Sequence, residues 1–392
     1  MPLIVVWNPA CGDRTAEPFF ESHVLPLLSS HGITPDSVVE TTHEGHAGEV
    51  VGGFVQTHFA SSSSPKDISV VLGSGDGTLH EVINDLYLQP SLSGVKIRLA
   101  LVPCGTANAL YSSFFPPPAP DAALKDTEYK LKSVRAFLED RGKVAPVSIS
   151  VTQFKKPRGD EDKKPVLSAV VTSTSLHAAL LNDSEKLREQ YPGLERFKIA
   201  AERNAKKWFK ARVKLLPSPS QATPEIYDPA SNSFIPSSDT ELVGPFAYFL
   251  STLNVDRLEP AFLITPLSRS IPAPAGSTDV VIIRPTRSPS VQADTQEERE
   301  AFAKTTWEVM GGAYQGGAHV KARYPGEGED EGPRVVEYFR CGGWEWHPHQ
   351  EDGDAHLVCT DGLISRIDEG GWAESRVETE PAGRPGFELY VA

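Results

Sequence analysis

The sequence Val70-Val-Leu-Gly-Ser-Gly-Asp-Gly-Thr-Leu-His-Glu-Val-Ile-Asn84 joins three local signals. An apolar run of strand length comes first, three glycines (Gly73, Gly75 and Gly77) follow, and apolar residues at helical spacing end it. Glycine lets backbone N–H groups approach a phosphate closely, and the positive end of the following helix dipole favours an anion. The pattern therefore predicts a strand, a tight turn and a helix that bind a phosphate group.

Asp76 is the unusual residue of this turn. A carboxylate repels phosphate unless it holds Mg²⁺ or takes a proton from an attacking hydroxyl, and both tasks belong to phosphoryl transfer. The alternative is an aspartate that forms the turn or caps the helix. Asp76 is thus the candidate catalytic base and metal ligand.

The surrounding chain alternates strands with helices. Each predicted strand is apolar on both faces, which is typical of a parallel sheet covered by helices. We expect a three-layer α/β nucleotide-binding domain over residues 1–144. Its predicted strands are 3–7, 38–42, 68–72 and 97–102, and its predicted helices are 17–31, 45–59 and 78–88.

A second glycine turn, Leu101-Val-Pro-Cys-Gly-Thr-Ala-Asn-Ala-Leu110, follows the next strand. Gly105 and Thr106 would bring N–H groups and a hydroxyl to the same sheet edge, and Asn108 would add an amide. Alone, this sequence fits a capping turn. Because ligands bind at the carboxyl edge of parallel sheets, two such turns, with Asn8 at the end of the first strand, favour a shared nucleotide pocket.

The pattern changes after residue 144. Short strands separated by Pro and Gly predict an antiparallel β-sandwich over residues 145–392, with the C-terminal tail free to return to the first domain. We expect a hairpin of strands 147–154 and 166–175 around a charged tip, a helix over 184–209, and a flexible Ser/Pro-rich insertion at 216–245. The later predicted strands are 246–252, 261–264, 279–284, 335–340, 356–359 and 387–391.

Composition limits the possible functions. The 392 residues include 38 Lys and Arg against 52 Asp and Glu, a net charge of −14, which disfavours nucleic-acid binding. A hydrophobic content of 39% suffices for packed cores. No apolar run reaches the roughly 18 residues of a transmembrane segment. Four cysteines without metal or redox spacing suit a reduced compartment, so we expect a cytoplasmic protein with transient membrane association.

The ordered motifs resemble the diacylglycerol kinase and sphingosine kinase family. The two glycine turns carry most of the resemblance, and further motifs follow in the family's order along nearly the whole chain. These are Asn8-Pro9 with Gly12, Thr42 with His46-Ala47, Ser184-Glu-Lys-Leu-Arg188, Glu195-Arg-Phe197, Ser277-Thr-Asp279 through Arg284, and Thr360-Asp-Gly362.

The resemblance implies an ATP- and Mg²⁺-dependent lipid kinase that acts on a lipid at a membrane surface. Asp76 would activate the lipid hydroxyl or act through the metal, Arg188 and Arg196 would reach the phosphates, and Asp361 and Gly362 would close the site. The remaining implied ATP-binding residues are Asn8, Thr42, His46, Ser74, Gly75, Gly77, Thr78, Gly105, Thr106 and Asn108. Without the resemblance, the two arginines would suit an exposed helix paired with glutamates. The oligomeric state stays open.

The lipid branch is less sharply defined. Ser74 and the His80-Glu81 pair resemble sphingosine kinases, so a sphingoid base is favoured over diacylglycerol or ceramide. Ala179 and Leu181 stand where those enzymes carry the aspartate that recognises the amino-alcohol head. Leu363 replaces the last residue of the family's C-terminal motif.

Two other functions remain possible from the sequence. An NAD kinase shares the glycine loop, although the second turn and the Ser184-Glu-Lys-Leu-Arg188 motif favour lipid kinases. A catalytically weak lipid- or nucleotide-binding protein would explain the Ala179 and Leu363 departures.

Overall fold

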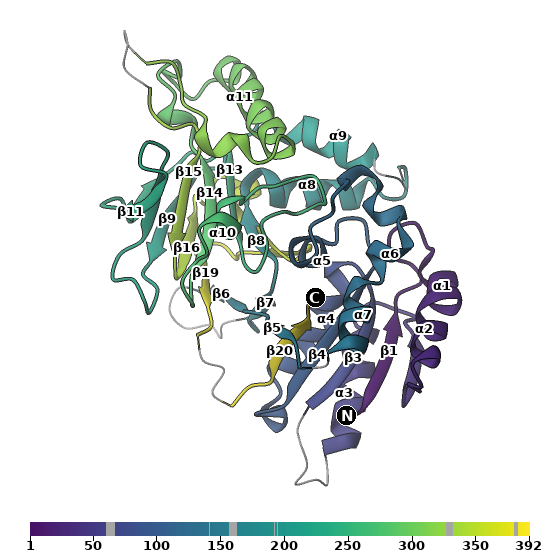
Figure 1. The fold of residues 1–392 in the computed structure, drawn as a ribbon. Helices are drawn as coiled ribbons and strands as arrows, with labels where there is room; N and C mark the ends of the chain where they lie inside the picture. The colour runs from purple at the N-terminus through teal and green to yellow at the C-terminus, as the bar shows by residue number, and fades with distance from the viewer. Residues whose placement is uncertain are drawn as a thin grey trace. The chain divides into compact units, whose positions relative to one another are not determined.

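The computed structural model describes residues 1–59, 67–140, 142–156, 163–191, 193, 195–326, 332–379 and 383–392. The chain divides into two compact units, whose helices and strands are labelled in Figure 1. The first unit comprises Met1–Ser148, Arg257–Ala261 and Glu380–Ala392. The second comprises Ile149–Asp256 and Phe262–Thr379. Part of the expected charged tip, residues 157–162, lies outside the described residues.

A six-stranded sheet of order β2-β1-β3-β4-β20-β5 forms the centre of the first unit. Neighbouring strands are parallel except for β20 and β5, so the predicted parallel sheet is confirmed. Its last strand but one, β20, comes from the C-terminal end of the chain. The strands are β1 (Leu3–Trp7), β2 (Ser37–Glu40), β3 (Asp67–Ser74), β4 (Lys96–Pro103), β5 (Val144–Pro146) and β20 (Gly386–Tyr390).

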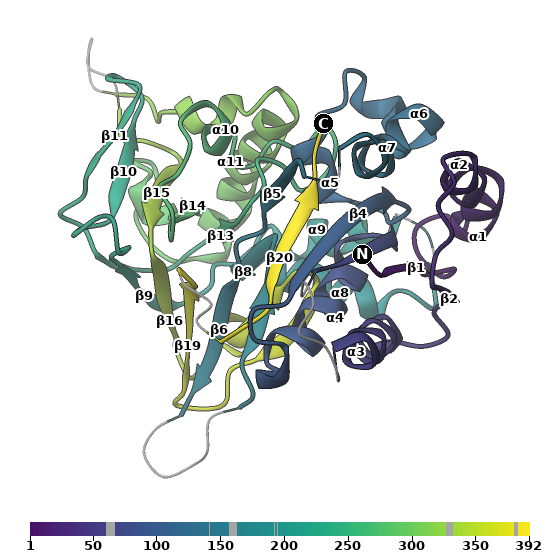
Figure 2. The same cartoon turned by 60° about the horizontal axis from the view of Figure 1, so that its bottom comes forward.

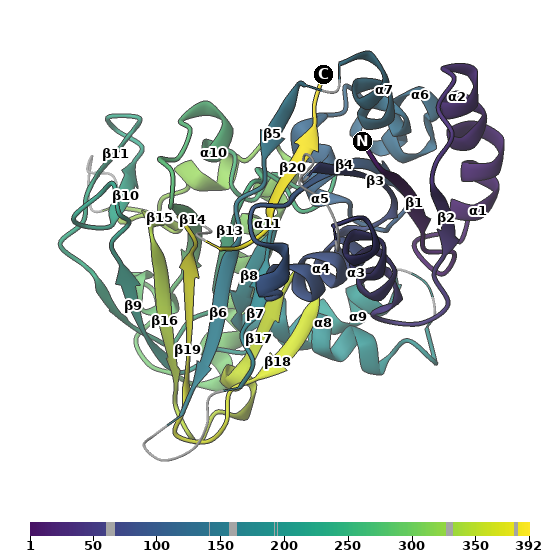
Figure 3. The same cartoon turned by 90° about the horizontal axis from the view of Figure 1, so that it is seen from below.

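Helices cover both faces of this sheet, as Figures 2 and 3 show. On one face, Leu3, Val5 and Trp7 of β1 pack with Phe20, from the π-helical turn between α1 and α2, and with Phe137 of α7. Helices α3 and α4 lie on the other face. The helices are α1 (Ala16–Phe19), α2 (Leu25–Ser30), α3 (His46–Phe59), α4 (Asp76–Tyr87), α5 (Ala109–Phe114), α6 (Thr127–Lys130) and α7 (Lys132–Glu139), and a π-helical turn, Phe20–Val24, joins α1 to α2.

The second unit contains two antiparallel sheets, as expected. One has eight strands in the order β11-β10-β15-β14-β13-β8-β17-β18, and the other has six in the order β12-β9-β16-β19-β6-β7. Phe249 of the larger sheet lies 5.1 Å from Trp344 and 5.3 Å from Trp346 of the smaller sheet, between ring centroids. These buried aromatic rings join the two sheets into a sandwich core.

The bounds of the second unit's elements follow from the structure. Its strands are β6 (Ser150–Lys155), β7 (Val166–Ser168), β8 (Val171–Thr174), β9 (Ala211–Leu216), β10 (Glu225–Asp228), β11 (Ser233–Pro236), β12 (Glu241–Val243), β13 (Tyr248–Thr252), β14 (Thr278–Ile283), β15 (Glu337–Cys341), β16 (Gly343–Pro348), β17 (Leu357–Thr360), β18 (Leu363–Arg366) and β19 (Trp372–Val377). Its helices are α8 (Ser175–Lys186), α9 (Glu195–Asn204), α10 (Leu267–Ser270) and α11 (Gln296–Tyr314).

Several local predictions for this unit were wrong. The single helix over 184–209 is two helices, α8 and α9, because the sequence between them holds the helix breakers Pro192 and Gly193. The flexible insertion at 216–245 contains three strands, β10, β11 and β12. The strand at 261–264 is absent from the described structure, and the long helix α11 was not predicted.

Candidate functional site

Three turns meet where β1, β3 and β4 end. The N–H of Asn8 donates to the carbonyl of Gly73 at 2.9 Å, which ties the turn after β1 to the end of β3. The N–H of Cys104 donates to the carbonyl of Ser74 at 3.1 Å, which ties the turn after β4 to the same strand. Parallel strands in register thus bring the predicted glycine turns to one sheet edge.

The three glycines of the first turn have different environments. A Cβ atom on Gly73 would lie 2.1 Å from the Phe20 ring, so this glycine makes room for the core. Gly75 meets Gly105 of the second turn, where a Cβ on Gly105 would lie 2.3 Å from the Gly75 Cα atom. Gly77 is exposed, with open space where its Cβ would be. Only Gly77 therefore presents an uncovered backbone of the kind that a phosphate could approach.

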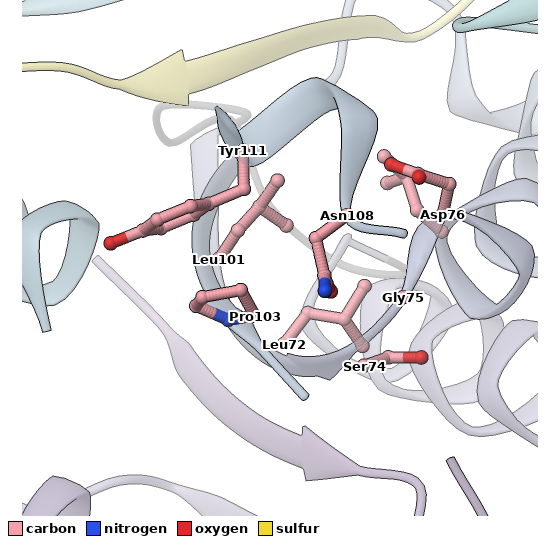
Figure 4. Close-up of a pocket in the computed structure, with 9 residues that line it drawn as sticks. Leu72, Ser74, Gly75, Asp76, Leu101, Pro103, Asn108 and Tyr111 are labelled. Carbon is pink, nitrogen blue, oxygen red and sulfur yellow. The ribbon is translucent and has the colours of Figure 1, made fainter. Parts of the chain in front are cut away.

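Asp76 is the first residue of α4 and lies between the two turns (Figure 4). Its carboxylate accepts hydrogen bonds from the N–H groups of Ala109 at 2.7 Å and Leu110 at 3.1 Å, the first residues of α5. A helix N-terminus favours an ionised carboxylate through these N–H groups and the helix dipole. Asp76 is only partly buried, so its carboxylate is fixed in place beside the surface.

Asn108 holds the second turn in shape. Its side-chain oxygen accepts from the Gly105 N–H at 3.0 Å, and its Nδ2 donates to the Gly105 carbonyl at 2.6 Å. The residue adopts a left-handed backbone with φ 54° and is buried. Both polar atoms of the amide bond the turn's own backbone, so in this structure Asn108 positions Gly105 and Thr106. Thr106 itself is exposed at the tip of the turn.

The other predicted nucleotide-binding residues of this unit form pairs. Asn8 Nδ2 donates to Thr78 Oγ1 at 3.2 Å, which joins the turn after β1 to α4. The Thr42 N–H donates to His46 Nδ1 at 3.1 Å, at the start of α3. Among the described residues, no group hydrogen-bonds to the buried Ser74 hydroxyl. Ser74 is thus a polar group left available for a ligand.

A pocket opens between the two glycine turns (Figure 4). Its empty volume is about 250 Å³. Apolar side chains form part of its wall, whereas Ser74, Asp76 and Asn108 supply the polar lining. The pocket brings the candidate base and the unpartnered hydroxyl to one place.

Glu81 has a role that the sequence did not indicate. Its carboxylate accepts hydrogen bonds from the N–H groups of Gly45 and Ala47, at the start of α3. Burial raises the pKa of Glu81, and these two hydrogen bonds partly oppose the rise. His80, the neighbour that suggested a sphingosine kinase, is buried in α4, where its imidazole contacts the Asn84 amide. Glu81 therefore fixes α3, and with it Thr42 and His46, against α4.

Arg188 and Arg196 lie in the second unit, on separate segments. Arg188 follows α8 and pairs with Glu185 at 2.6 Å, whereas Arg196 belongs to α9 and its guanidinium lies 4.6 Å from the centre of the Phe197 ring. Burial and the neighbouring Arg188 charge lower the pKa of Arg196. The predicted single helix over 184–209 therefore does not carry both arginines, yet the two cations are close enough to repel one another.

Asp361 and Gly362 form the two-residue turn between β17 and β18. Both have positive φ, 49° and 100°, as a type I′ hairpin turn requires. The Asp361 carboxylate accepts from the N–H groups of Ala169, Val170 and Val171 at 2.7 to 2.9 Å. These bonds hold the bend where the predicted strand 166–175 divides into β7 and β8, in different sheets. Asp361 therefore has a structural role in its own unit.

The positions that the resemblance implies for head-group recognition, Ala179 and Leu181, hold no carboxylate. Ala179 is buried, and Leu181 is partly buried on α8. Burial acts against ionisation of the nearby Asp183, but hydrogen bonds from Asn204 and Lys186 lower its pKa overall. Asn204 Nδ2 and Lys186 Nζ each donate to this carboxylate at 2.9 Å. The Asp183 carboxylate thus accepts hydrogen bonds from residues of its own unit.

The geometry of the first unit defines a class: an α/β domain whose glycine turns and single acid suit phosphoryl transfer. Residues 2–137 match the sequence model of the diacylglycerol kinase catalytic domain. Human sphingosine kinase 2 is 37% identical over 109 residues, which cover 28% of this chain and 15% of that protein. Sphingosine kinase 1 of Arabidopsis thaliana is 29% identical over 199 residues, which cover 50% of this chain and 36% of that protein.

A solved structure extends the fold comparison to the second unit. A crystal structure of a putative diacylglycerol kinase from Bacillus anthracis covers 99% of this chain and 95% of its own, with a TM-score of 0.54 and 13% identity. The matched stretches of the sphingosine kinases cover about a third of their length or less. Over residues 2–137 the chain is thus similar to the catalytic domain of the diacylglycerol kinases, and it shares part of its sequence with the sphingosine kinases.

Proposed function

We propose that the protein is an ATP-dependent lipid kinase that transfers the γ-phosphoryl group of ATP to a lipid hydroxyl. The observation that carries this proposal is the meeting of the two glycine turns at Gly75 and Gly105, with the Asp76 carboxylate fixed beside them. The family match over residues 2–137 covers the same turns.

The nucleotide would bind along the edge of the first sheet. The open backbone at Gly77, the unpartnered Ser74 hydroxyl and the exposed Thr106 suit phosphate oxygens, and Asn8 and Thr78 would line the same edge. Thr42 and His46 would contact another part of the nucleotide, and the resemblance also implies phosphate contacts for Arg188 and Arg196. Asn108 would act by positioning its turn. We assign Asp361 and Gly362 no contact with ATP.

A metal ion would share its ligands with the nucleotide. The described residues contain no cluster of three or more His, Cys, Asp or Glu side chains that could hold a metal. Mg²⁺ commonly binds one or two carboxylates together with substrate phosphates, so Asp76 and ATP would suffice. When bound, the ion would neutralise the negative charge that develops on the phosphates.

Asp76 would act on the acceptor hydroxyl. The amides of Ala109 and Leu110 donate to its carboxylate, and the side chain is only partly buried beside the pocket. The carboxylate would accept the proton of the lipid hydroxyl as its oxygen attacks phosphorus. The two amides would hold the carboxylate ionised and oriented for this step.

The acceptor is proposed to be a sphingoid long-chain base, with diacylglycerol or ceramide as the alternative. Sequence similarity to the sphingosine kinases supports the first choice. The absence of a carboxylate at Ala179 and Leu181 supports the alternative with an uncharged head group, because no acid at these positions would pair with the ammonium group of a sphingoid base. No helix in the described parts of the chain is long and apolar enough to cross a bilayer. We propose a cytoplasmic location, with the substrate met at a membrane surface.

The deciding experiment is a phosphoryl-transfer assay with labelled ATP and a panel of acceptors. Sphinganine, ceramide, diacylglycerol and monoacylglycerol are offered in mixed micelles, and NAD in solution. Label on one lipid, lost when EDTA removes Mg²⁺ and regained when the ion returns, is the expected result. Label on NAD alone would establish an NAD kinase and contradict the proposal.

A second candidate is a nucleotide-binding protein with little catalytic activity. The exposed Leu363 in the family's C-terminal motif and the buried Ala179 favour it. ATP binding by calorimetry, without label on any acceptor, would support this candidate against the kinase.

A further inference from the structure

Two cysteines face one another at the edge of the first sheet. Cys11 lies in the turn after β1, and Cys104 directly follows β4. Their thiols are hydrogen-bonded to each other. The backbones are also close: Gly12 has φ 53°, and a Cβ there would lie 2.2 Å from the Cys104 carbonyl oxygen. Residues far apart in the sequence thus place two sulfur atoms in contact beside the glycine turns.

The surroundings of this pair favour reaction of one thiol. The hydrogen bond from Cys11 lowers the pKa of the Cys104 thiol; burial opposes this, and the Lys130 charge assists it. The same hydrogen bond, together with burial, raises the pKa of Cys11. Cys11 is partly exposed, whereas Cys104 is buried. A thiol whose pKa is lowered, with a cation nearby and a partly exposed second thiol as its hydrogen-bond partner, is the arrangement found at redox-sensitive cysteines.

The other two cysteines provide an internal contrast. Cys341 and Cys359 are fully buried in the second unit, and burial raises the pKa of each thiol to about 12. Buried, protonated thiols react slowly with oxidants. The chain therefore carries one reactive pair and two inert reference cysteines.

We propose that Cys11 and Cys104 are an oxidation site that closes to a reversible disulfide in the presence of a peroxide. The Cys104 thiolate attacks one peroxide oxygen, the O–O bond breaks, and the released hydroxide takes up a proton to leave as water. The Cys11 sulfur then attacks the sulfenic acid at Cys104, the S–S bond forms, and the S–O bond breaks to release a second water with the Cys11 proton. Two thiols are oxidised and one peroxide is reduced.

The cross-link would act on the nucleotide site. It would join the turn that carries Asn8, which bonds to Thr78 of α4, to the turn that carries Gly105 and Thr106, whose Asn108 lines the Asp76 pocket. This consequence rests on the proposed function, because it assumes that ATP binds along these turns. We expect the disulfide to weaken ATP binding roughly tenfold, within the usual range of coupling between sites.

The test treats the purified full chain with hydrogen peroxide, blocks the remaining thiols with N-ethylmaleimide, and maps the peptides by mass spectrometry. The expected product links Cys11 to Cys104, leaves Cys341 and Cys359 reduced, and disappears after dithiothreitol. C341S should still form the link, and neither C11S nor C104S should. Over-oxidation of Cys104 without a link, or faster oxidation of Cys341, would overturn the proposal.

Calorimetry with ATP on reduced, oxidised and re-reduced protein measures the consequence. A loss of affinity that dithiothreitol reverses supports it, and equal affinities in all three states would overturn it. If the reduced protein binds no ATP, the proposed nucleotide site fails, while the peptide map still decides whether the oxidation site exists.

Discussion

Asp76-Gly77 and Asp361-Gly362 are Asp-Gly pairs whose aspartates both accept hydrogen bonds from backbone N–H groups. Asp76 receives two such bonds from the start of α5, lies partly exposed beside a pocket, and is followed by Gly77 with open space around it. Asp361 receives three, is buried, and forms a hairpin turn with Gly362. The same dipeptide thus supports a candidate reaction in one unit and a bend between sheets in the other.

The two carboxylates differ in their access to a substrate. Asp361 is buried, whereas Asp76 is only partly buried and lines a pocket. We therefore expect substitution of Asp76 to lower turnover and substitution of Asp361 to lower stability.

Asp76→Asn should cause the largest effect. The amide cannot accept a proton from the lipid hydroxyl, so kcat should fall about a thousandfold, within the usual range for general base catalysis. A labelled-ATP assay on the best lipid measures this, and thermal unfolding of the same preparation shows whether the fold is kept. Turnover at the wild-type rate would rule out Asp76 as the base.

Asp361→Ala should act on stability. Three N–H groups at the bend between β7 and β8 would lose their acceptor, and we expect the free energy of unfolding to fall by about 3 kcal/mol. Urea unfolding followed by circular dichroism measures the change. A stable Asp361→Ala variant with lost ATP binding would instead favour the direct role that the family resemblance implies.

Gly105→Ala and Gly77→Ala form a matched pair. The new methyl group at Gly105 would collide with the Gly75 backbone and lower the free energy of unfolding by about 2 kcal/mol, whereas at Gly77 it meets open space. Gly77→Ala should leave stability within about 0.5 kcal/mol and weaken ATP binding. Unchanged ATP affinity in Gly77→Ala would remove this glycine from the proposed phosphate site.

Glu81→Gln should give the smallest effect, and one that depends on pH. Because burial raises the pKa of Glu81 in the folded state, its contribution to stability is present at low pH and is lost as pH rises through that pKa. The variant has no charge to bury, so its stability relative to the wild type should increase as pH rises above about 4, near the usual pKa of a glutamate. If the difference in melting temperature between Glu81→Gln and the wild type does not change with pH, the raised pKa of Glu81 is contradicted.

The features that could be predicted are those that depend on residues close together in the sequence. β1, β3 and β4 are short apolar runs, and the glycine turns after β3 and β4 are visible as such. The convergence of Asn8, Thr78 and Gly105 follows from the rule that parallel strands present their carboxyl ends at one edge. These features need no knowledge of distant contacts.

The missed features depend on partners far along the chain. Strand β10, inside the expected flexible insertion, pairs with β15, more than a hundred residues later. The bend that divides strand 166–175 is held by the Asp361 carboxylate, again from a distant segment. Asn108 and Glu81 bond to backbone N–H groups, which carry no sequence signal. Sequence patterns identify candidate polar residues, but they do not show which of these residues make their hydrogen bonds within the fold.

Strand β20 places a constraint on how the first unit is made. It lies between β4 and β5, and its Tyr390 hydroxyl is 2.7 Å from Ser69 Oγ on β3. On the ribosome, therefore, residues 1–148 of the first unit emerge first, but their sheet lacks a strand until residues 386–390 follow. Until then β4 has an unpaired edge that can pair with a strand of another chain, which is a known route to aggregation. A recombinant fragment that stops at residue 137 would keep that edge permanently.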